Sequence, residues 1–567
     1  MSDKLEELKK AGLAPEWYTQ ESYKTVQGGY LYKGENPIDM YKRVAKTAAI
    51  KINRPELEKD FFDIMFNKNW LNPASPVLSN LGTDRGLSIS CYGVDVGDSV
   101  FEIYDSVKEM ALLTKGGGGV GMSMSRIRTR GTPIKGGANG KSEGIVPWAK
   151  VVDSAILATS QGNVRRGAAS LNLDIEHGDY EEFLPIRRPK GDINRQCLNL
   201  HQCSVISDSF MYKVKNGDSK ARHKWIETLK SRLESGEPFI MFSDNVNKVN
   251  PVGYKNLNLN VSMTNICSEI VLYTDEQHSF ICCLSSINLT KWHEWKNSNL
   301  VELATLFLNG VLNDFIEKGS KIPGFEKVVA SAIKGRAIGI GALGWHSLLQ
   351  QNSIAFDSFE AMMLNAEIFK HISDKAKETS KQLCQIYGEP EWCTGSGMYN
   401  SHLVAVAPTR SNSIISGDLS AGIEPIMANA YNDKTSKGIF IRKNKDLAIL
   451  LETHDKNNDD VWRSILINNG SVQHLQFLSD HEKEVFKTAY EINQMSLIKQ
   501  AAQRQKYICQ AQSLNLFFPA DADPKWFSDV HMLAWESGVK TLYYCKSSSV
   551  IKGDVASRGD DCRSCEA

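Results

Sequence analysis

The chain has 567 residues, 42% of them hydrophobic and 23% charged, and its 66 basic residues balance 66 acidic ones. This length exceeds one ordinary core and suits a large α/β barrel with appendages, while the balanced charge gives no indication of a nucleic-acid partner. No apolar run is long enough to cross a membrane, and the charged N-terminus has no signal-peptide core, so we expect a cytoplasmic protein. Its twelve cysteines are then expected to be mostly thiols, with any disulfide catalytic and transient.

The predicted elements begin with helices over residues 1–70, where apolar residues recur at helical spacing. From 71 to 546, short β-rich runs alternate with helical ones, which indicates parallel strands with helices outside them. So many units favour a barrel over an open sheet. The polar stretch 547–567 is predicted to be a mobile tail. We expect strands at 87–94, 120–127, 168–175, 239–242, 404–407 and 514–518, and helices at 100–113 and 145–159.

The stretch 265–269, Asn-Ile-Cys-Ser-Glu, carries three chemically useful side chains at alternate positions. In an extended segment Asn265, Cys267 and Glu269 point to one side, because side chains alternate along a strand. A carboxylate that moves a proton, an amide that orients hydroxyls and a reactive sulfur then lie together. The five residues alone also fit a half-buried strand with a structural cysteine.

Two further pairs of cysteines suggest redox chemistry. Cys91 and Cys282 each lie in a β-rich run, where they could face each other across a barrel interior and supply two electrons beside Cys267. Two buried structural cysteines are the alternative. Cys562 and Cys565 form a Cys-x-x-Cys pair, a spacing that closes a disulfide easily. The pair could also be half of a zinc site, but no second Cys or His pair lies beside it, which makes that interpretation weaker.

Two polar loops and an aromatic pair complete the pattern. The loop 408–413 is rich in hydroxyls and contains Arg410, and the loop 72–76 lies ahead of it in the chain. Such loops can cradle phosphate, although an ordinary polar turn is the commoner explanation. Tyr543 and Tyr544 end the folded part; adjacent tyrosines usually pack in a strand with their polar tips exposed.

Seven such features, taken together, resemble the large catalytic subunit of class I ribonucleotide reductase. In chain order they are Asn72-Pro73-Ala74-Ser75-Pro76, Cys91, Asn265-x-Cys267-x-Glu269, Cys282, Pro408-Thr409 with Gly422-Ile423-Glu424-Pro425, Tyr543-Tyr544, and the cysteine-rich tail. The resemblance implies a ten-stranded α/β barrel, an N-terminal helical region, and a central finger loop with Cys267 at its tip. It also implies an enzyme that reduces ribonucleoside diphosphates.

The resemblance assigns roles to these residues. Cys267 corresponds to the thiyl radical that removes the ribose 3′ hydrogen, Glu269 to the base for the 3′ hydroxyl, and Asn265 to its hydrogen-bonding partner. Cys91 and Cys282 correspond to the dithiol that reduces the 2′ carbon. Tyr543 and Tyr544 correspond to a relay from a separate metal-containing, radical-generating small subunit. Cys562 and Cys565 correspond to the shuttle that re-reduces the dithiol with electrons from thioredoxin or glutaredoxin.

Substrate and effector contacts follow from the same resemblance. Substrate binding is assigned to Ser75, Ser90, Gly118, Thr409, Arg410, Ser411, Asn412 and Ser413. Contacts with a deoxynucleoside triphosphate or ATP specificity effector are assigned to Asp98, Ser99, Arg128, Gly162 and Arg165. Arg166 stands where glycine is common in the family, and effector sites of this kind lie at the interface of a homodimer. No cofactor or metal is expected on the chain itself.

The chain departs from the family pattern at its front, where Cys91 comes too early to leave room for an N-terminal ATP cone. We therefore expect no overall on/off nucleotide site here. A cobalamin-dependent reductase on the same barrel is one alternative, but it needs no tyrosine relay. A non-catalytic nucleotide-binding regulator would be expected to have lost Cys267 or Glu269, and a generic thiol–disulfide exchange protein would not need Glu269.

Overall fold

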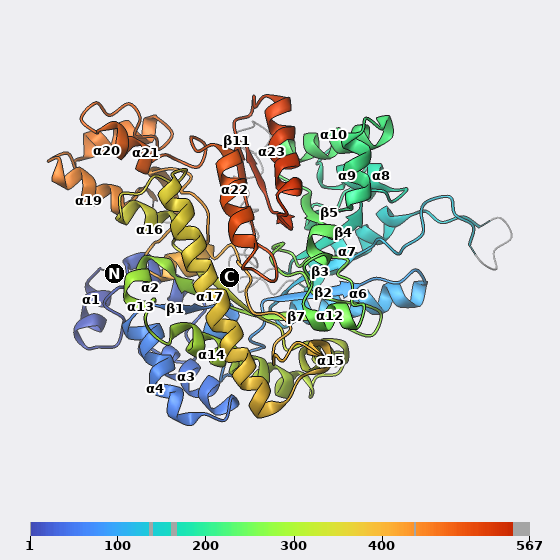
Figure 1. The fold of residues 1–567 in the computed structure, drawn as a ribbon, viewed down its shortest axis with the longest axis horizontal. Coiled ribbons are helices and arrows are strands. Elements are labelled where there is room, and N and C mark those ends of the chain that lie inside the picture. The colour runs from blue at the N-terminus through green and yellow to red at the C-terminus, as the bar shows by residue number, and fades with distance from the viewer. Residues whose placement is uncertain (1, 135–139, 160–166, 436–437, 548–567) are drawn as a thin grey trace.

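The computed structural model describes residues 2–134, 140–159, 167–435 and 438–547 (Figure 1). The N-terminal helices, shown in blue in Figure 1, gather with α14 (Leu300–Gly319) at one end of the molecule. Helix α17 (Phe359–Tyr387), shown in yellow, contacts α14 and runs through the middle of the view. The chain begins with α1 (Ser2–Lys10), α2 (Gln20–Gln27), α3 (Pro37–Lys51), α4 (Glu58–Phe62), β1 (Leu71–Pro73) and α5 (Ser75–Asn80).

Helix α3 shows how the N-terminal region is fixed to the rest of the chain. Pro37 occupies its first turn, and the backbone N–H of Asn36 donates to Asp39 Oδ2 at 3.0 Å, so the start of the helix is well satisfied. Its buried face packs against α14. A Cβ at Gly310 would lie 2.4 Å from the carbonyl oxygen of Ala48, so only glycine lets the two helices approach this closely.

The centre of the molecule is one large sheet. In the described part of the chain it contains nine strands, eight of them in the order β1-β7-β2-β3-β4-β5-β6-β12, with β8 also paired to β7. Strands β2 to β6 pair in parallel, whereas β7 is antiparallel to β2, and β12 to β6. The strands are β2 (Cys91–Asp95), β3 (Gly119–Ser123), β4 (Ala169–Asp174), β5 (Leu200–Ile206), β6 (Phe239–Phe242), β7 (Phe280–Asn288), β8 (Ile338–Leu343) and β12 (Thr541–Leu542).

Helices connect the strands and form the outer layer. The connections are α6 (Val100–Lys115), α7 (Ile145–Thr159), α8 (Tyr180–Phe183), α9 (Asp208–Lys215), α10 (Ser219–Ser235), α11 (Ser243–Asn247), α12 (Val252–Asn256), α13 (Trp292–Trp295), α15 (Glu326–Gly335), α16 (Trp345–Gln351) and α18 (Arg410–Ile415). The later part of the chain adds α19 (Lys445–Thr453), α20 (Asp459–Ile467), α21 (Asp480–Val485), α22 (Gln494–Gln505) and α23 (Pro524–Glu536), with the strand pairs β9 (Ala430–Thr435)–β10 (Gly438–Lys443) and β11 (Leu516–Phe518)–β13 (Cys545–Ser547). No described helix has the length and apolar character needed to span a bilayer.

The mixed α/β fold and the helical N-terminal region predicted from the sequence are confirmed, but one predicted strand is wrong. Residues 404–407 form only isolated parallel bridges, Val404 to Ile340 and Val406 to Gln512. The backbone N–H groups of Leu403 and Val404 donate instead to Cys509 Sγ, at 3.1 and 3.3 Å. A thiol therefore takes the place of the carbonyls that a regular ladder would supply. The predicted tail lies almost wholly outside the described residues.

Candidate active site

A loop between α12 and β7, residues 257–279, runs along the inner strands and carries the predicted reaction centre. Asn172 of β4 holds it by accepting a hydrogen bond from Thr264 N at 3.1 Å and donating to Thr264 O at 3.2 Å. Gly121 of β3 makes room for it, since a Cβ there would lie 2.2 Å from Thr264 O. Strands β3 and β4 therefore fix the position of this loop, called the finger below.

The tip of the finger is a turn rather than the extended segment expected from the sequence. Ser268 has a φ of +68°, and its N–H donates to Asn265 O at 3.2 Å. A residue with positive φ breaks the alternation of a strand, so the prediction that strand geometry aligns the three side chains is wrong in its reason. The turn is closed by Asn265 Oδ1, which accepts from Ile270 N at 3.0 Å.

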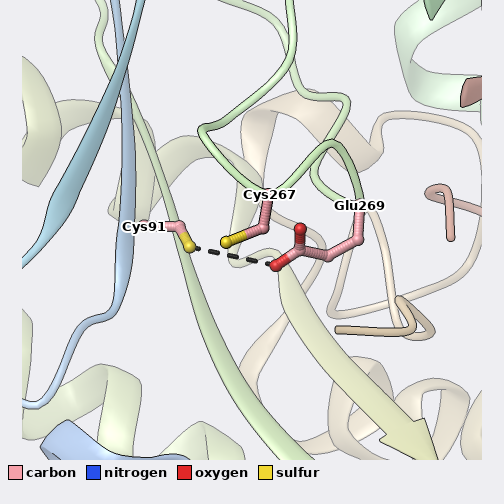
Figure 2. A group of neighbouring side chains, drawn as sticks. All are labelled: Cys91, Cys267 and Glu269. Carbon is pink, nitrogen blue, oxygen red and sulfur yellow. Dashed lines mark hydrogen bonds between the residues drawn. The ribbon is translucent and has the colours of Figure 1, made fainter. Parts of the chain in front are cut away.

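The turn nevertheless brings the predicted groups together. Cys91, Cys267 and Glu269 point toward one another in Figure 2, and one ligand-type atom from each lies within 4.8 Å of the others. Cys91 Sγ lies 3.9 Å from Glu269 Oε1, and Asn265 Nδ2 donates to Cys91 Sγ at 3.1 Å. All four side chains are buried.

Cys91 and Cys282 lie side by side instead of across a barrel interior. Strands β2 and β7 are antiparallel neighbours, and Cys91 and Cys282 are direct register partners. Partners in an antiparallel pair have Cβ atoms about 4.5–5.5 Å apart, so a disulfide needs only a modest local adjustment. The predicted association of the two cysteines is thus supported by a closer geometry than the one expected.

The carboxyl group of Glu269 has a pKa close to neutral pH. Burial raises its pKa to about 7, and hydrogen bonds from Asn265 and Ser513 offset that effect only in part. Ser513 Oγ lies 3.1 Å from Glu269 Oε2 and 2.5 Å from Cys267 O, so it contacts the residues on both sides of Ser268. A carboxyl with this pKa can accept a proton at physiological pH.

Sequence reasoning missed Ser513 and Gln510. Gln510 Nε2 lies 3.4 Å from Cys282 Sγ, and Ala511 N donates to Glu269 O at 2.9 Å. The segment 509–513 therefore contacts Cys282 and Glu269 together. It lies more than 220 residues beyond Cys282 and carries no catalytic residue type, so nothing in the local sequence marks it.

The two polar loops predicted to bind phosphate are adjacent. Asn412 Nδ2 donates to Pro73 O at 2.6 Å, and Gly422 N donates to Thr409 Oγ1 at 2.7 Å. Thr409 has a φ of +54° and immediately precedes α18, which contains Arg410, Ser411, Asn412 and Ser413. Arg410 is exposed, whereas Ser413 is buried and shares a hydrogen bond with Thr409.

Two predicted substrate residues have polar atoms free to take a ligand. Among the described residues, Ser90 Oγ and Asn412 Oδ1 are buried without a hydrogen-bond partner. Buried polar atoms of this kind are uncommon without a functional reason. Gly118 packs against the ring of Tyr92, where a Cβ would come within 2.2 Å, and Ser75 Oγ is hydrogen-bonded to the hydroxyl of Tyr30 at 2.6 Å.

A cavity of about 450 Å³ connects the phosphate loop to the tyrosine pair. Arg410, Glu424, Tyr543 and Tyr544 all line it. The rings of Tyr543 and Tyr544 lie 4.4 Å apart between centroids. Tyr543 belongs to the same buried cluster of contacting side chains as Cys267, and Tyr544 packs against that cluster. The tyrosines thus lie between a cavity and the finger.

The predicted effector residues are only partly described. Arg128 forms an ion pair with Asp98, with Nε 2.8 Å from Oδ2, and its backbone N–H donates to Oδ1 of the same carboxylate. Ser99 caps α6 by accepting from Glu102 N at 3.2 Å. Gly162 and Arg165 lie outside the described residues, as do Cys562 and Cys565.

Cys91, Cys267 and Glu269 are also a set of donors that a metal ion could use. Two sulfurs and one carboxylate would leave one position of a tetrahedral site open. Asn265 also donates an N–H to Cys91 Sγ at 3.1 Å.

Comparison with known proteins identifies the family. Residues 16–86 match the family model "Ribonucleotide reductase, all-alpha domain", and residues 89–221, 217–396 and 391–545 match "Ribonucleotide reductase, barrel domain".

Individual relatives agree with this assignment. The chain is 38% identical to the putative ribonucleoside-diphosphate reductase large subunit of Frog virus 3 (isolate Goorha), over 87% of this chain and 88% of that protein. It is 36% identical to the ribonucleoside-diphosphate reductase large subunit of Invertebrate iridescent virus 3, over 88% and 89% of the two chains. The solved Actinobacillus ureae class Id ribonucleotide reductase alpha subunit superposes with a TM-score of 0.87 at 38% identity, covering 95% of this chain and 99% of that one. The chain therefore belongs to the ribonucleotide reductase family, as a class I large, catalytic subunit.

Proposed function

We propose that the chain reduces ribonucleoside diphosphates to 2′-deoxyribonucleotides by thiyl-radical chemistry centred on Cys267. The observation that carries this proposal is the buried cluster of Cys91, Cys267 and Glu269, with Cys282 beside Cys91 in the sheet. One hydrogen-abstracting sulfur, one proton acceptor and one dithiol are thereby collected in a site from which water is excluded.

Each group has a step to perform. The 2′ hydroxyl of a ribose does not leave by simple displacement, but a radical at C3′ eases its departure. Cys267 as a thiyl radical takes the 3′ hydrogen, and Glu269 accepts the proton of the 3′ hydroxyl. A thiol of the Cys91–Cys282 pair gives the proton with which the 2′ hydroxyl leaves as water. The second thiol of the pair gives a hydrogen atom to C2′, and the pair then passes one further electron to the 3′ ketone and becomes a disulfide. Glu269 returns its proton to the 3′ oxygen, and Cys267 returns a hydrogen atom to C3′ and becomes a thiyl radical again.

Asn265 and Ser513 keep these groups in position. Asn265 uses its oxygen to close the turn and its N–H to hold Cys91, so it links the finger to β2. Ser513 bridges the Cys267 carbonyl and the Glu269 carboxylate. We assign the phosphates of the substrate to the loops around Ser75 and 409–413. The unpaired Ser90 Oγ and Asn412 Oδ1 and the backbone of Gly118 are assigned to the rest of the nucleotide.

Radical and electrons come from partners. The tyrosine pair, Tyr543 and Tyr544, is suited to stepwise transfer from a metal-containing small subunit to Cys267, since the aromatic rings are in contact and share a cluster with the sulfur. Cys562 and Cys565 re-reduce the Cys91–Cys282 disulfide by thiol exchange and receive electrons from thioredoxin or glutaredoxin. No metal or cofactor is assigned to this chain itself.

In this proposal, specificity effectors bind near Asp98, Ser99 and Arg128, and Gly162 and Arg165 complete the site. The chain acts as a homodimer, and it acts in the cytoplasm. The ion pair between Asp98 and Arg128 places both polar groups at the start of α6. The two alternatives are less well supported: a cobalamin-dependent enzyme has no use for the tyrosine pair, and a non-catalytic regulator has no use for an intact Cys267–Glu269 cluster.

The test is reduction of nucleoside diphosphates by the purified chain with and without candidate small subunits. We expect activity that requires a small subunit and is abolished by Cys267→Ala, because alanine removes the sulfur while fitting the turn. Substrate affinity and melting temperature should stay close to those of the unchanged chain. Cys283→Ala is the matched control, since Cys283 is a buried neighbour of Cys282 that faces the carbonyl of Leu308 in α14. Deoxynucleotide formation by Cys267→Ala, or activity that depends on adenosylcobalamin alone, contradicts the proposal.

A further inference from the structure

A second cavity has a volume of about 460 Å³. Helices α17 and α22, both central in Figure 1, contribute to its wall together with the segments 249–253 and 537–540. None of Cys91, Cys267 and Glu269 lines it, so it is separate from the site already described. A space of this size suits a small organic molecule.

The charged residues around this cavity are all of one sign. Lys377, Lys506 and Lys540 line it, and no Asp or Glu is found among the described residues of its wall. Lys377 and Lys506 are exposed at its rim, whereas Lys540 is only 1% exposed. Most of the remaining surface is apolar, including Met398 and Leu403.

Lys540 is a buried cation with an incomplete set of partners. Its Nζ donates to Cys509 O at 2.6 Å and to Gln510 O at 2.9 Å, and an ammonium has a third N–H to give. In the described part of the chain no carboxylate pairs with it, and the adjacent His402 is neutral, because burial and the charge of Lys540 lower its pKa to about 3. Lysine is almost never fully buried without a counter-charge.

We propose that this cavity binds a small organic anion, whose acidic group is neutralised by Lys540 and whose apolar body packs against Met398 and Leu403. A carboxylate, sulfonate or phosphate would supply the missing counter-charge and the missing hydrogen-bond acceptor. The burial that lowers the pKa of Lys540 to about 8 is the same effect that makes a buried ammonium gain from an anion.

The cavity also adjoins the reaction centre through the backbone. Cys509 lines it, and the residues that follow, Gln510 to Ser513, hold Cys282 and Glu269. Lys540 immediately precedes β12, which leads into Tyr543. A bound anion would therefore contact both segments that hold the catalytic groups in place, without touching those groups.

The test uses two fluorescent probes of similar shape and different charge. These are 1-anilinonaphthalene-8-sulfonate and its uncharged parent, N-phenyl-1-naphthylamine, titrated into the full folded chain. We expect saturable binding of the sulfonate at one site per chain, weakened about tenfold or more by Lys540→Met, since one charged hydrogen bond is lost. Binding of the uncharged probe should be weaker in the unchanged chain and insensitive to Lys540→Met.

A footprint on the unchanged chain locates the probe even if Lys540→Met does not fold. Cys509 and Cys384 are both partly exposed thiols, but only Cys509 lines the cavity. The sulfonate should slow alkylation of Cys509 by iodoacetamide and leave Cys384 unaffected. Binding without protection of Cys509, or equal binding of the two probes, would overturn the proposal.

Discussion

The Glu269 carboxyl is buried, which favours its neutral form, but its hydrogen-bond donors favour its ionised form. Its surroundings are a thiol, an amide N–H and a hydroxyl, and burial raises its pKa to about 7. A group with this pKa changes protonation state within the physiological range, whereas an exposed glutamate stays ionised. The activity proposed for this site should therefore depend on pH through this residue.

We expect kcat/KM to rise with pH along an acid limb up to about pH 7 and to level off above it. Below that pH Glu269 is protonated and cannot accept the 3′ hydroxyl proton, so kcat/KM should fall about tenfold per pH unit. Glu269→Gln should lower the rate by roughly 10²–10⁴ and remove this limb. The measurement is the pH–rate profile of the assembled enzyme.

Glu109→Gln is a matched control for that profile. Glu109 is also buried with a pKa raised by burial, but it lies in α6 and contacts none of the proposed catalytic groups. Its substitution should leave the acid limb in place. An unchanged limb in Glu269→Gln would show that another group is the base.

Substitution of Tyr543 and Tyr544 by phenylalanine distinguishes a role in radical transfer from a role in packing. Replacing either by phenylalanine keeps the ring and removes only the hydroxyl, so a packing tyrosine would cost at most about 1–3 kcal/mol of stability. A relay tyrosine should lose turnover almost completely while the chain stays folded and binds substrate. Tyr254→Phe is the control, because Tyr254 is a buried tyrosine of the same side-chain cluster with no assigned role. Substantial turnover in Tyr543→Phe or Tyr544→Phe would remove that residue from the relay.

At the scale of elements, the finger depends on the glycines of β3. Gly121→Ala would place a Cβ 2.2 Å from Thr264 O, and the obstacle is backbone, so the finger must move. We expect a loss of about 1–3 kcal/mol in unfolding free energy, as for other overpacked sites. We also expect most of the activity to be lost, because the finger carries the proposed catalytic groups. Thermal or denaturant unfolding and nucleotide reduction measure the two effects.

Gly28→Ala is the corresponding control. Gly28 ends α2 with a φ of −68°, and its nearest non-neighbour atom would lie 3.2 Å from a Cβ, so alanine should be tolerated. Full activity in Gly121→Ala would mean that β3 does not position the finger.

Elements with a regular side-chain pattern could be predicted from the sequence, and those set by distant contacts could not. The helix predicted at 145–159 has those bounds in the structure, because its apolar residues repeat at helical spacing without interruption. The turn at the finger tip was missed, since a positive φ at Ser268 leaves no mark in the residue type. Ser513 was missed for another reason: its contact with Glu269 spans 244 positions of sequence. The adjacency of Cys91 and Cys282 depends on the pairing of β2 with β7, which is likewise non-local.

At the scale of the whole molecule, the helices α6 and α7 expose large apolar side chains. Phe101 is 80% exposed, and Val100, Tyr104 and Leu157 are each more than half exposed on the same two helices, which pack against each other. Grouped apolar exposure of this kind marks an interaction surface. The predicted effector residues Asp98 and Ser99 directly precede α6, so a homodimer formed by these helices would bring the effector site to the interface.

We therefore expect Phe101→Asp to weaken dimerisation, because a carboxylate would be buried against apolar side chains of the second copy. The change should shift the population toward monomer in sedimentation at micromolar concentration, and effector-dependent substrate choice should weaken with it. Phe359→Asp is a close control, since Phe359 is also 80% exposed but starts α17, on another part of the chain. Monomers in both variants, or in neither, would contradict the assignment of α6 and α7 as the dimer surface. If only Phe101→Asp is monomeric and it still reduces nucleotides without effector control, the reaction centre is complete in one chain and the second copy serves regulation.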